Sequence, residues 1–179
     1  VFFNSLHGEF ILDDRYMIKD NPRVHSWRFV PDYFTEGVWH NSGLADLDEV
    51  GGVYYRPLHL LLLRGTYAAF GSNPFGYHVV SLLLFLANVA LVYFIARKLL
   101  EHAGQRDDIA AAAATLIFAV HPTHTESVAW ISGATDPLAF LFVLASFRFY
   151  MHSVERGSRG AFAASILCCA LGLLTKETV

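Results

Sequence analysis

The sequence predicts an all-α fold, a polytopic membrane helix bundle with a long outward loop that contains short interfacial helices. Hydrophobic residues make up 54% of the 179 residues and charged residues only 16%, whereas a soluble domain carries about 25% charged residues. The long apolar blocks follow residue 74, and nine of the sixteen acidic residues precede residue 50. We therefore expect a polar loop followed by membrane spans.

Several other features narrow the class of protein. The net charge of −3 is not basic enough to indicate nucleic-acid binding. Cys168 and Cys169 are adjacent within an apolar segment, and such neighbours rarely form a disulfide with each other. The sequence begins with Val1 and shows no signal-peptide pattern. We treat it as a fragment of a longer membrane protein.

Residues 1–74 are expected to form the outward loop. Within it, the segment "PLHLLLLRGTYAAF" at 57–70 is apolar but only 14 residues long, and it contains Arg64. This length and the internal charge favour an interfacial or re-entrant helix over a span. If 57–70 did span, residues 1–50 would move to the other side of the membrane, away from the later polar loops.

Residues 75–179 are expected to form four transmembrane helices, at about 75–100, 108–122, 136–152 and 160–175. The first is the clearest, because no charge occurs from Phe75 to Ala96, about the 20 residues that a bilayer crossing requires. The apolar cores of the other three contain only 12 to 15 residues, so a buried hairpin of soluble helices is the alternative for each. Their position after one long span, with short polar connectors, favours membrane helices.

Basic residues predict the orientation of this bundle. Two connectors are flanked by cations, namely Arg97, Lys98 and Arg106, and Arg148, Arg156 and Arg159. The connector 121–136 contains no Lys or Arg. The positive-inside rule places the two basic connectors in the cytoplasm. Residues 1–74, the loop 121–136 and the pair Lys176–Glu177 then share the opposite face.

The adjacent acids Asp13 and Asp14 are the first candidate site residues. Taken alone, the pair is most simply a helix cap, since Asp is a preferred N-cap residue. It follows the apolar run "FIL", so we expect it close to the membrane surface. A carboxylate there can act as a general base or hold a divalent cation such as Mg or Mn.

The second outward loop reads "HPTHTESVAWISGATD" and offers His121, His124 and Glu126. The H-x-x-H-x-E spacing is not the H-E-x-x-H pattern of zinc proteases, and Pro122 interrupts any helix between the histidines. We expect a short interfacial helix beginning near His124, with Trp130 as its interface anchor. That helix would point a histidine and a carboxylate into the same cavity as Asp13.

Candidate phosphate ligands come from the motifs "YYRPLH" and "TKET". Arg56 could simply reach the lipid headgroups, but a guanidinium is also well suited to bidentate phosphate binding. Lys176 ends the last predicted span in the same way, either as an interfacial ion pair with Glu177 or as a second phosphate ligand. Tyr55, His121 and Glu177 are assigned supporting positions.

Together these motifs resemble a known family. The segments "ILDDRYMIKDNPRV", "YYRPL", "NPFGYHVVSLLLFLANVAL", "FAVHPTHTESVAWISGATDPLAFLF" and "LLTKET" are similar, in order and spacing, to the transmembrane and tetratricopeptide-repeat-containing O-mannosyltransferases and their bacterial relatives. Those proteins are GT-C glycosyltransferases, which use sugars linked to a lipid phosphate. The resemblance implies that the chain corresponds to the first outward loop and the following four helices of a GT-C catalytic domain.

The resemblance also implies a function. A sugar, most simply mannose, would move from a polyprenyl or dolichyl phosphate to a Ser or Thr hydroxyl of a protein. Asp13 and Asp14 match the family's acidic pair, with the base role given first to Asp14, and His124 with Glu126 matches its second outward motif. The site would lie on the periplasmic or lumenal face of a bacterial inner membrane or endoplasmic reticulum membrane. We expect the fragment alone to be inactive.

Two other readings compete with a glycosyltransferase. A transporter or flippase component would carry charges within its spans, but only Arg148 fits that description. A non-catalytic membrane scaffold that retains the fold would leave the Asp pair far from the His–Glu loop. The distance between these two segments is therefore the structural test.

Overall fold

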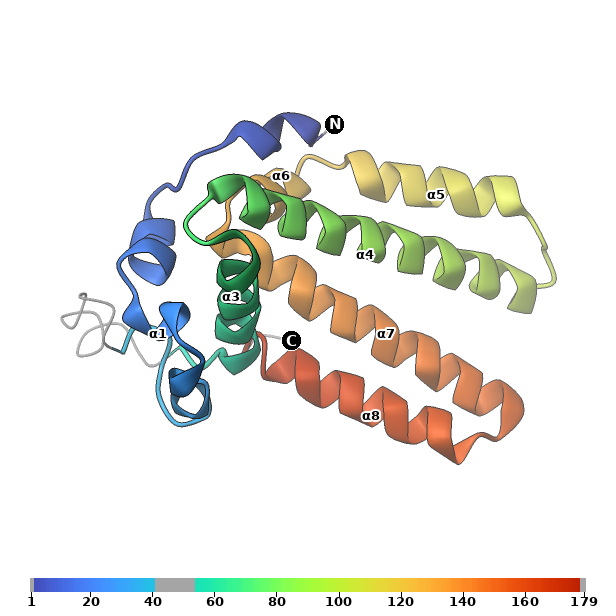
Figure 1. Cartoon of the computed structure of the whole chain (residues 1–179). Helices are drawn as coiled ribbons and strands as arrows, with labels where there is room; N and C mark the ends of the chain where they lie inside the picture. The colour runs from blue at the N-terminus through green and yellow to red at the C-terminus, as the bar shows by residue number, and fades with distance from the viewer. Residues whose placement is uncertain (1, 41–53, 178–179) are drawn as a thin grey trace.

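The computed structural model describes residues 2–40 and 54–177. The ordered elements of this part of the chain are all helical, and none of its residues lies in a β-strand. The predicted all-α class is therefore confirmed. Long helices lie side by side on one side of the molecule, and short helical turns gather at one end of them (Figure 1).

The N-terminal region consists of short turns of helix that turn sharply from one to the next. In order, these are η1 (Phe3–His7), the π-helical turn η2 (Arg15–Lys19), α1 (Pro22–His25), η3 (Trp27–Phe29) and η4 (Pro31–Phe34). Pro opens α1 and η4, where the missing N–H group costs no hydrogen bond. Asn21 caps α1 by accepting a hydrogen bond from the Arg23 N–H group at 3.0 Å.

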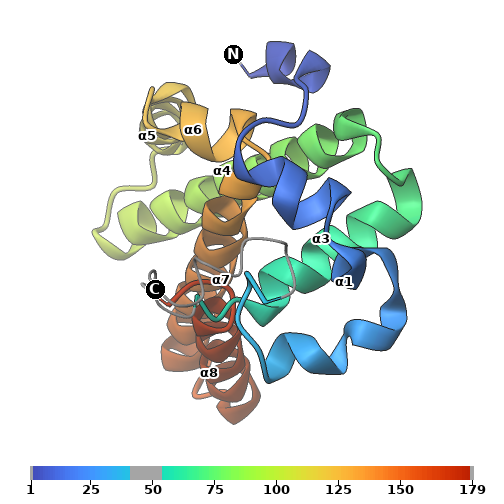
Figure 2. The same ribbon diagram turned by 90° about the vertical axis from the view of Figure 1, so that its left-hand side faces the viewer.

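Helix α3 (Pro57–Phe70) occupies the segment whose placement the sequence left open. It is a single 14-residue helix that runs across the ends of the long helices (Figures 1 and 2). This orientation fits the expected interfacial helix, whose position relative to a membrane stays a prediction.

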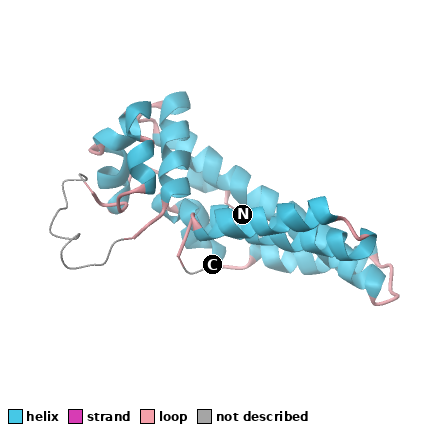
Figure 3. Ribbon diagram, turned by 90° about the horizontal axis from the view of Figure 1, so that it is seen from below, coloured by secondary structure: helices cyan, strands magenta, loops and turns pink. Residues whose placement is uncertain are grey.

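Two helical hairpins form the rest of the molecule. Helix α4 (Pro74–His102) packs on α5 (Asp108–Val120), and α7 (Thr135–Arg156) packs on α8 (Arg159–Leu173). Helices α4 and α7 also pack on each other, so the hairpins form one bundle (Figure 3). Helix α7 ends at Gly157, whose φ of +61° is a left-handed conformation that glycine adopts without a steric penalty.

Among residues 2–40 and 54–177, only α4 and the stretch Ser132–Arg156 are both long and apolar enough to cross a membrane. Helices α5 and α8 have 13 and 15 residues, or about 20 and 22 Å at 1.5 Å per residue, against a hydrocarbon core of about 30 Å. That all four helices span therefore stays a prediction. In each of these helices, only 22% of the most apolar 18-residue stretch is buried. A soluble core helix would be mostly covered, so the exposed apolar surface favours lipid contact.

The polar segments meet at one end of this bundle. The N-terminal turns, α3, α6 (His124–Ala129) and the C-terminal residues all lie there, whereas the α4–α5 and α7–α8 connectors lie at the far end (Figures 1 and 2). We call residues 2–40, α3 and the segment 121–134 the cap.

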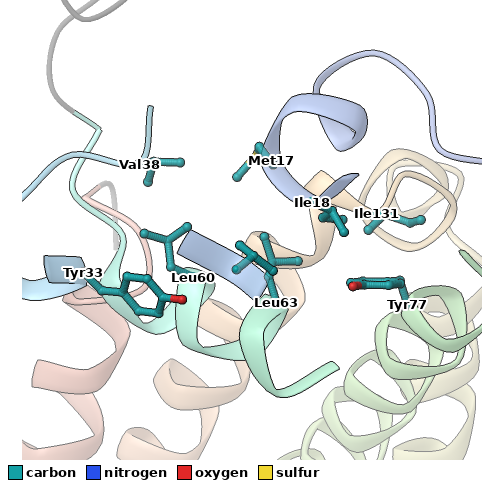
Figure 4. Close-up of a cluster of buried hydrophobic side chains, with 9 residues drawn as sticks. Met17, Ile18, Tyr33, Val38, Leu60, Leu63, Tyr77 and Ile131 are labelled. Carbon is teal, nitrogen blue, oxygen red and sulfur yellow. The ribbon is translucent and has the colours of Figure 1, made fainter. Parts of the chain in front are cut away.

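A hydrophobic core holds the cap together. Side chains from the N-terminal turns, α3, α4 and the segment after α6 interlock in it (Figure 4), and its buried members are Met17, Ile18, Val24, Tyr33, Val38, Leu60, Leu63, Tyr77 and Ile131. Because these segments are far apart in the sequence, burying their apolar surface together fixes the position of the outward loop on the bundle.

Two buried arginines supplement this core. Arg23 is 1% exposed, and its guanidinium donates to the carbonyl oxygens of Gly37 (2.9 Å), His40 (3.1 Å) and Asp32 (3.1 Å). Arg64 of α3 donates to the Val24 carbonyl oxygen at 3.2 Å. Both side chains therefore satisfy loop carbonyl groups that would otherwise be buried without a partner.

Candidate active site

A cavity of about 280 Å³ lies in the cap where the three outward segments meet. Its acidic, basic and histidine lining residues are Asp13, Arg56, His59, Glu126, Asp136 and Lys176. The structure thus brings Asp13 of the first loop and Glu126 of the second loop to one cavity. A catalytic site requires this proximity, whereas a non-catalytic scaffold does not predict it.

An unusual backbone conformation presents Asp13 to this cavity. Leu12, the residue before it, has a φ of +47°, and it is the only described residue other than glycine with a positive φ. A branched side chain adopts this region at a cost, and such strain concentrates at functional sites. A π-helical turn, also common at functional sites, follows the pair at Arg15–Lys19.

Asp14 is buried and fully engaged by protein donors. Its Oδ2 atom accepts from the Ile11 N–H group at 3.1 Å, and its Oδ1 atom accepts from both the N–H group (2.8 Å) and the hydroxyl of Ser132. The side chain is 0% exposed and does not line the cavity. Asp14 therefore ties the first outward loop to the second.

Asp13 has the opposite environment. It is half-buried, it lines the cavity, and no described residue donates a hydrogen bond to its carboxylate. A carboxylate with free lone pairs at a cavity wall can accept a proton from a substrate. The geometry therefore favours Asp13 over Asp14 as the base.

Arg56 lies at the cavity in a bidentate ion pair. Its Nε and Nη2 groups donate to the Glu177 carboxylate at 3.0 and 2.7 Å, and its guanidinium lies 4.8 Å from the centre of the Tyr54 ring. These hydrogen bonds from Arg56 hold the pKa of Glu177 below its usual value. A guanidinium has five N–H donors, so the pair leaves Arg56 able to bind an anion.

Lys176 also lines the cavity, and it pairs with Asp136 rather than with its neighbour Glu177. The two cations of the site are thus each held by a carboxylate from another segment. An ammonium group has three donors, so Lys176 too retains capacity for a phosphate oxygen.

His59 is a cavity residue that we did not assign from the sequence. It is 1% exposed, and neither of its ring nitrogens has a partner among residues 2–40 and 54–177. Burial, with the charge of Arg56 as a second cause, lowers its pKa to about 3, so the imidazole is neutral at pH 7. The sequence did contain a signal for His59. It follows Arg56 by three residues at the start of one helix, and residues three apart on a helix lie next to each other.

Helix α6 directs Glu126 and His124, which were expected to act together, into different cavities. Glu126 lines the cavity, whereas His124 lines a neighbouring cavity of about 280 Å³ and packs on the rings of Phe85 and Phe118. Burial and the nearby His121 lower the pKa of His124. Asp136 borders both cavities, so the two spaces adjoin.

The backbone turns closely after α6. A Cβ atom on Gly133 would lie 2.9 Å from the Glu126 carbonyl oxygen, so only glycine permits this approach. The turn brings the Ser132 N–H group and hydroxyl to Asp14. Ser132 and Asp136, like His59, were not among the predicted site residues.

None of the three residues assigned supporting positions lines the cavity. Glu177 binds Arg56 at its wall, and the other two lie elsewhere. The exposed ring of His121 shares a hydrogen bond of 2.7 Å with the Thr123 hydroxyl. The Tyr55 hydroxyl donates to the Phe34 carbonyl oxygen at 3.0 Å. Neither side chain lines the cavity.

The donor set does not fit a divalent cation as it stands. Within the described ranges, no group of three or more His, Cys, Asp and Glu side chains is placed to hold a metal ion. Both carboxylate oxygens of Asp14 already accept hydrogen bonds from the protein. Asp14 is therefore not available to bind a metal ion together with Asp13.

Comparison with known proteins agrees with the chemistry of this cavity. The chain is 33% identical to protein O-mannosyl-transferase Tmtc1 of Drosophila melanogaster over 99% of its length and 20% of the relative's. It is 36% identical to TMTC1 of Mus musculus over 87% of its length and 16% of the relative's. It is 34% identical to protein O-mannosyl-transferase TMTC2 of Homo sapiens over 99% of its length and 21% of the relative's.

The chain thus spans about one fifth of the length of these curated relatives. No solved structure matches it. A family model described as dolichyl-phosphate-mannose-protein mannosyltransferase matches residues 56–179, which include Arg56, Glu126 and Lys176. The resemblance seen in the sequence motifs is therefore confirmed, and the chain belongs to the dolichyl-phosphate-mannose-protein mannosyltransferase family.

Proposed function

We propose that the full-length protein transfers mannose from a dolichyl or polyprenyl phosphate to a Ser or Thr hydroxyl of a protein. One observation carries this proposal: a single cavity joins Asp13 and Glu126 with the cations Arg56 and Lys176, from three distant segments. The charges of this site lie at one end of the bundle rather than along it, which favours an enzyme at the membrane interface over a transport path. Family membership supports the same reaction.

In this reaction Asp13 is the base. Its carboxylate takes the proton of the acceptor hydroxyl while the hydroxyl oxygen attacks the anomeric carbon of the mannose. The bond between that carbon and the phosphate oxygen breaks, and its electron pair leaves with the lipid phosphate. Because a phosphate is a good leaving group once its charge is neutralised, the site needs cations more than a strong general acid.

Arg56 and Lys176 supply those cations. The remaining N–H donors of both side chains bind the phosphate oxygens, while Glu177 and Asp136 hold the cations in place between turnovers. Glu126, which also lines the cavity, accepts hydrogen bonds from the sugar hydroxyls. His124 and the adjoining cavity are assigned to the acceptor side.

The cavity is assigned to the lumenal or periplasmic face of an endoplasmic reticulum or bacterial inner membrane. The absence of cations from the connector 121–136 supports this orientation.

A transfer assay on the purified full-length protein tests the reaction. Dolichyl-phosphate mannose, dolichyl-phosphate glucose and GDP-mannose are compared as donors, with a Thr-containing acceptor peptide and its Thr→Ala version. We expect mannose transfer from dolichyl-phosphate mannose alone, and only to the peptide that contains Thr. Transfer from GDP-mannose, or no transfer from the lipid donor, would contradict the proposal.

The phosphate role is tested in the same assay by Arg56→Gln. Because hydrogen bonds to a charged group contribute about 1.5–3 kcal/mol, KM for the donor should rise at least about tenfold. Arg28→Gln, which removes an exposed cation outside the cavity, is the matched control and should leave KM unchanged.

The dependence on a metal ion is tested with a chelator. The proposed reaction uses no metal ion, so we expect EDTA to change the transfer rate by less than about twofold. In metal-dependent sites, loss of even an outer-shell partner of a ligand costs about 10–100-fold. A large loss that Mg or Mn restores would assign a metal to Asp13 after all.

A further inference from the structure

Arg148 is a charged residue within an apolar stretch of α7, and the proposed reaction does not use it. It lies eight residues before the end of the helix at Arg156, or about 12 Å along the axis at 1.5 Å per residue. Its neighbours on both sides are aromatic, in the sequence "SFRFY". A charge at such a depth in a membrane is costly, and it usually faces an anion or a polar cavity.

No protein group neutralises Arg148 within residues 2–40 and 54–177. Its guanidinium makes no hydrogen bond, and no described carboxylate lies within 4.0 Å of it. The five N–H donors of the guanidinium are therefore free to bind an anion from outside the described chain.

A cavity of about 300 Å³ opens beside this side chain, between α4 and α7. Its lining residues are Leu91, Phe94, Arg97, Lys98, Glu101 and Arg148. Three cations thus face one carboxylate, and two apolar side chains complete the wall. A space lined by excess positive charge and by apolar groups fits an anion that carries an apolar tail.

The other two cations of the wall are each paired with carboxylates. Arg97 pairs with Asp108 at 3.0 Å, and Lys98 pairs with Glu101 at 3.1 Å and Glu155 at 3.4 Å. These side chains are partly exposed, and exposed ion pairs are weak and exchange readily. They hold Arg97 and Lys98 at the rim of the cavity but leave both able to interact with a bound anion.

The lining residues of this cavity come from the C-terminal halves of α4 and α7. Those halves lead to the α4–α5 and α7–α8 connectors, at the end of the bundle far from the cap (Figure 1). This is the end that the basic connectors assign to the cytoplasmic leaflet, where anionic phospholipids are enriched. Basic pockets between membrane helices on that side bind anionic lipid headgroups.

We propose that this cavity binds the phosphate headgroup of an anionic phospholipid. Arg148 donates hydrogen bonds to the phosphate oxygens, and Arg97 and Lys98 add positive charge at the rim. Leu91 and Phe94 contact the beginning of the acyl chains. The site is separate from the proposed transfer reaction and does not depend on it.

Competition binding on the full-length protein in neutral detergent tests this site. Phosphatidylglycerol labelled on an acyl chain is the probe, and unlabelled phosphatidylglycerol, phosphatidylcholine and inorganic phosphate are the competitors. We expect one saturable site that phosphatidylglycerol empties while the other two, at the same concentration, do not. Arg148→Gln should weaken probe binding about tenfold, the lower limit for loss of a charged hydrogen bond.

Arg106→Gln is the matched control, because it removes an exposed cation of the α4–α5 connector that does not line the cavity. It should change the affinity by less than about twofold. Arg148→Lys keeps the charge but loses the planar five-donor group. It should bind the probe more weakly than wild type, which maintains the test if the Gln variant does not fold. Equal competition by phosphatidylcholine, or unchanged binding by Arg148→Gln, would overturn the proposal. Equal competition by inorganic phosphate would overturn the assignment to a lipid.

Discussion

The cap and the two hairpins are stabilised by different means. In the cap, the charged groups of Arg23 and Asp14 are almost fully buried. Arg23 binds backbone carbonyl groups of other N-terminal turns, and Asp14 binds the backbone of the distant Ser132. In the hairpins, large apolar side chains such as Leu86 and Ile117 are more than half exposed. Few side-chain hydrogen bonds join the long helices, for example from Asn88 to the Pro137 carbonyl oxygen at 2.8 Å.

This difference follows from the surroundings that each region requires. Exposed apolar side chains are stable in lipid, where length and hydropathy are enough to place a helix. The cap must instead enclose a polar cavity, so its loops need specific partners for each buried polar group. We therefore expect single substitutions of buried polar residues to disrupt the cap far more than the hairpins.

Arg23→Met should have the largest effect on stability. The substitution leaves the carbonyl oxygens of Asp32, Gly37 and His40 without their donor, and breaking a buried charged network costs about 3–5 kcal/mol. Limited proteolysis of the full-length protein should show early cleavage within residues 2–40 while the helical content of the bundle is retained. Arg28→Gln, which replaces an exposed cation of the same region, should be cleaved as slowly as wild type. If Arg23→Met were also cleaved as slowly as wild type, the proposed dependence of the cap on buried polar groups would be wrong.

His59 should make the stability of the cap depend on pH. Its pKa falls from 6.5 in the unfolded chain to about 3 in the fold, so the unfolded chain binds the proton more readily between these values. The stability that the neutral ring contributes is complete above about pH 6.5 and is lost as the pH falls toward 3. At pH 5 the loss is about 2 kcal/mol.

Thermal midpoints at pH 7 and pH 5 measure this effect. His59→Phe removes the titrating group, so its midpoint should fall less than that of wild type between the two values. His7→Gln replaces an exposed histidine and should behave as wild type. An equal fall for wild type and His59→Phe would show that His59 is not buried in its neutral form.

Ser146→Ala should have the smallest effect. The Ser146 hydroxyl of α7 donates to the Ser165 carbonyl oxygen of α8 at 2.9 Å, and hydrogen bonds between membrane helices average about 0.6 kcal/mol. A small fall in the thermal midpoint is expected, with Ser153→Ala on the same helix as the control. A loss as large as that of Arg23→Met would mean that the hairpins also depend on specific polar contacts.

The sequence predicted the fold class and four of the residues around the cavity. Hydropathy and spacing located the helices after residue 74, because helix length and apolar content are local properties. The cationic connectors then placed Asp13, Arg56, Glu126 and Lys176 on one face, and the structure brings all four to one cavity.

The different environments of Asp13 and Asp14 could not be predicted, because two adjacent aspartates look alike in the sequence. The distinction depends on the left-handed conformation of Leu12 and on hydrogen bonds from Ser132, which is 118 residues away. The burial of His59 likewise depends on how the N-terminal turns fold over α3. The direction of His124 depends on which side of α6 faces Phe85 and Phe118, which a helix of six residues does not reveal from its pattern.

The most direct test of the proposed site compares Asp13→Asn with Asp14→Asn in the full-length protein, measuring both the transfer rate and the thermal midpoint. Asp13→Asn should lower the rate about 10²–10⁴-fold, the usual contribution of a general base, and leave the midpoint unchanged. Asp14→Asn should lower the midpoint, because its charged hydrogen bonds to Ile11 and Ser132 contribute about 1.5–3 kcal/mol each. Full turnover in Asp13→Asn, with the rate lost only in a stably folded Asp14→Asn, would contradict the assignment and return the base role to Asp14.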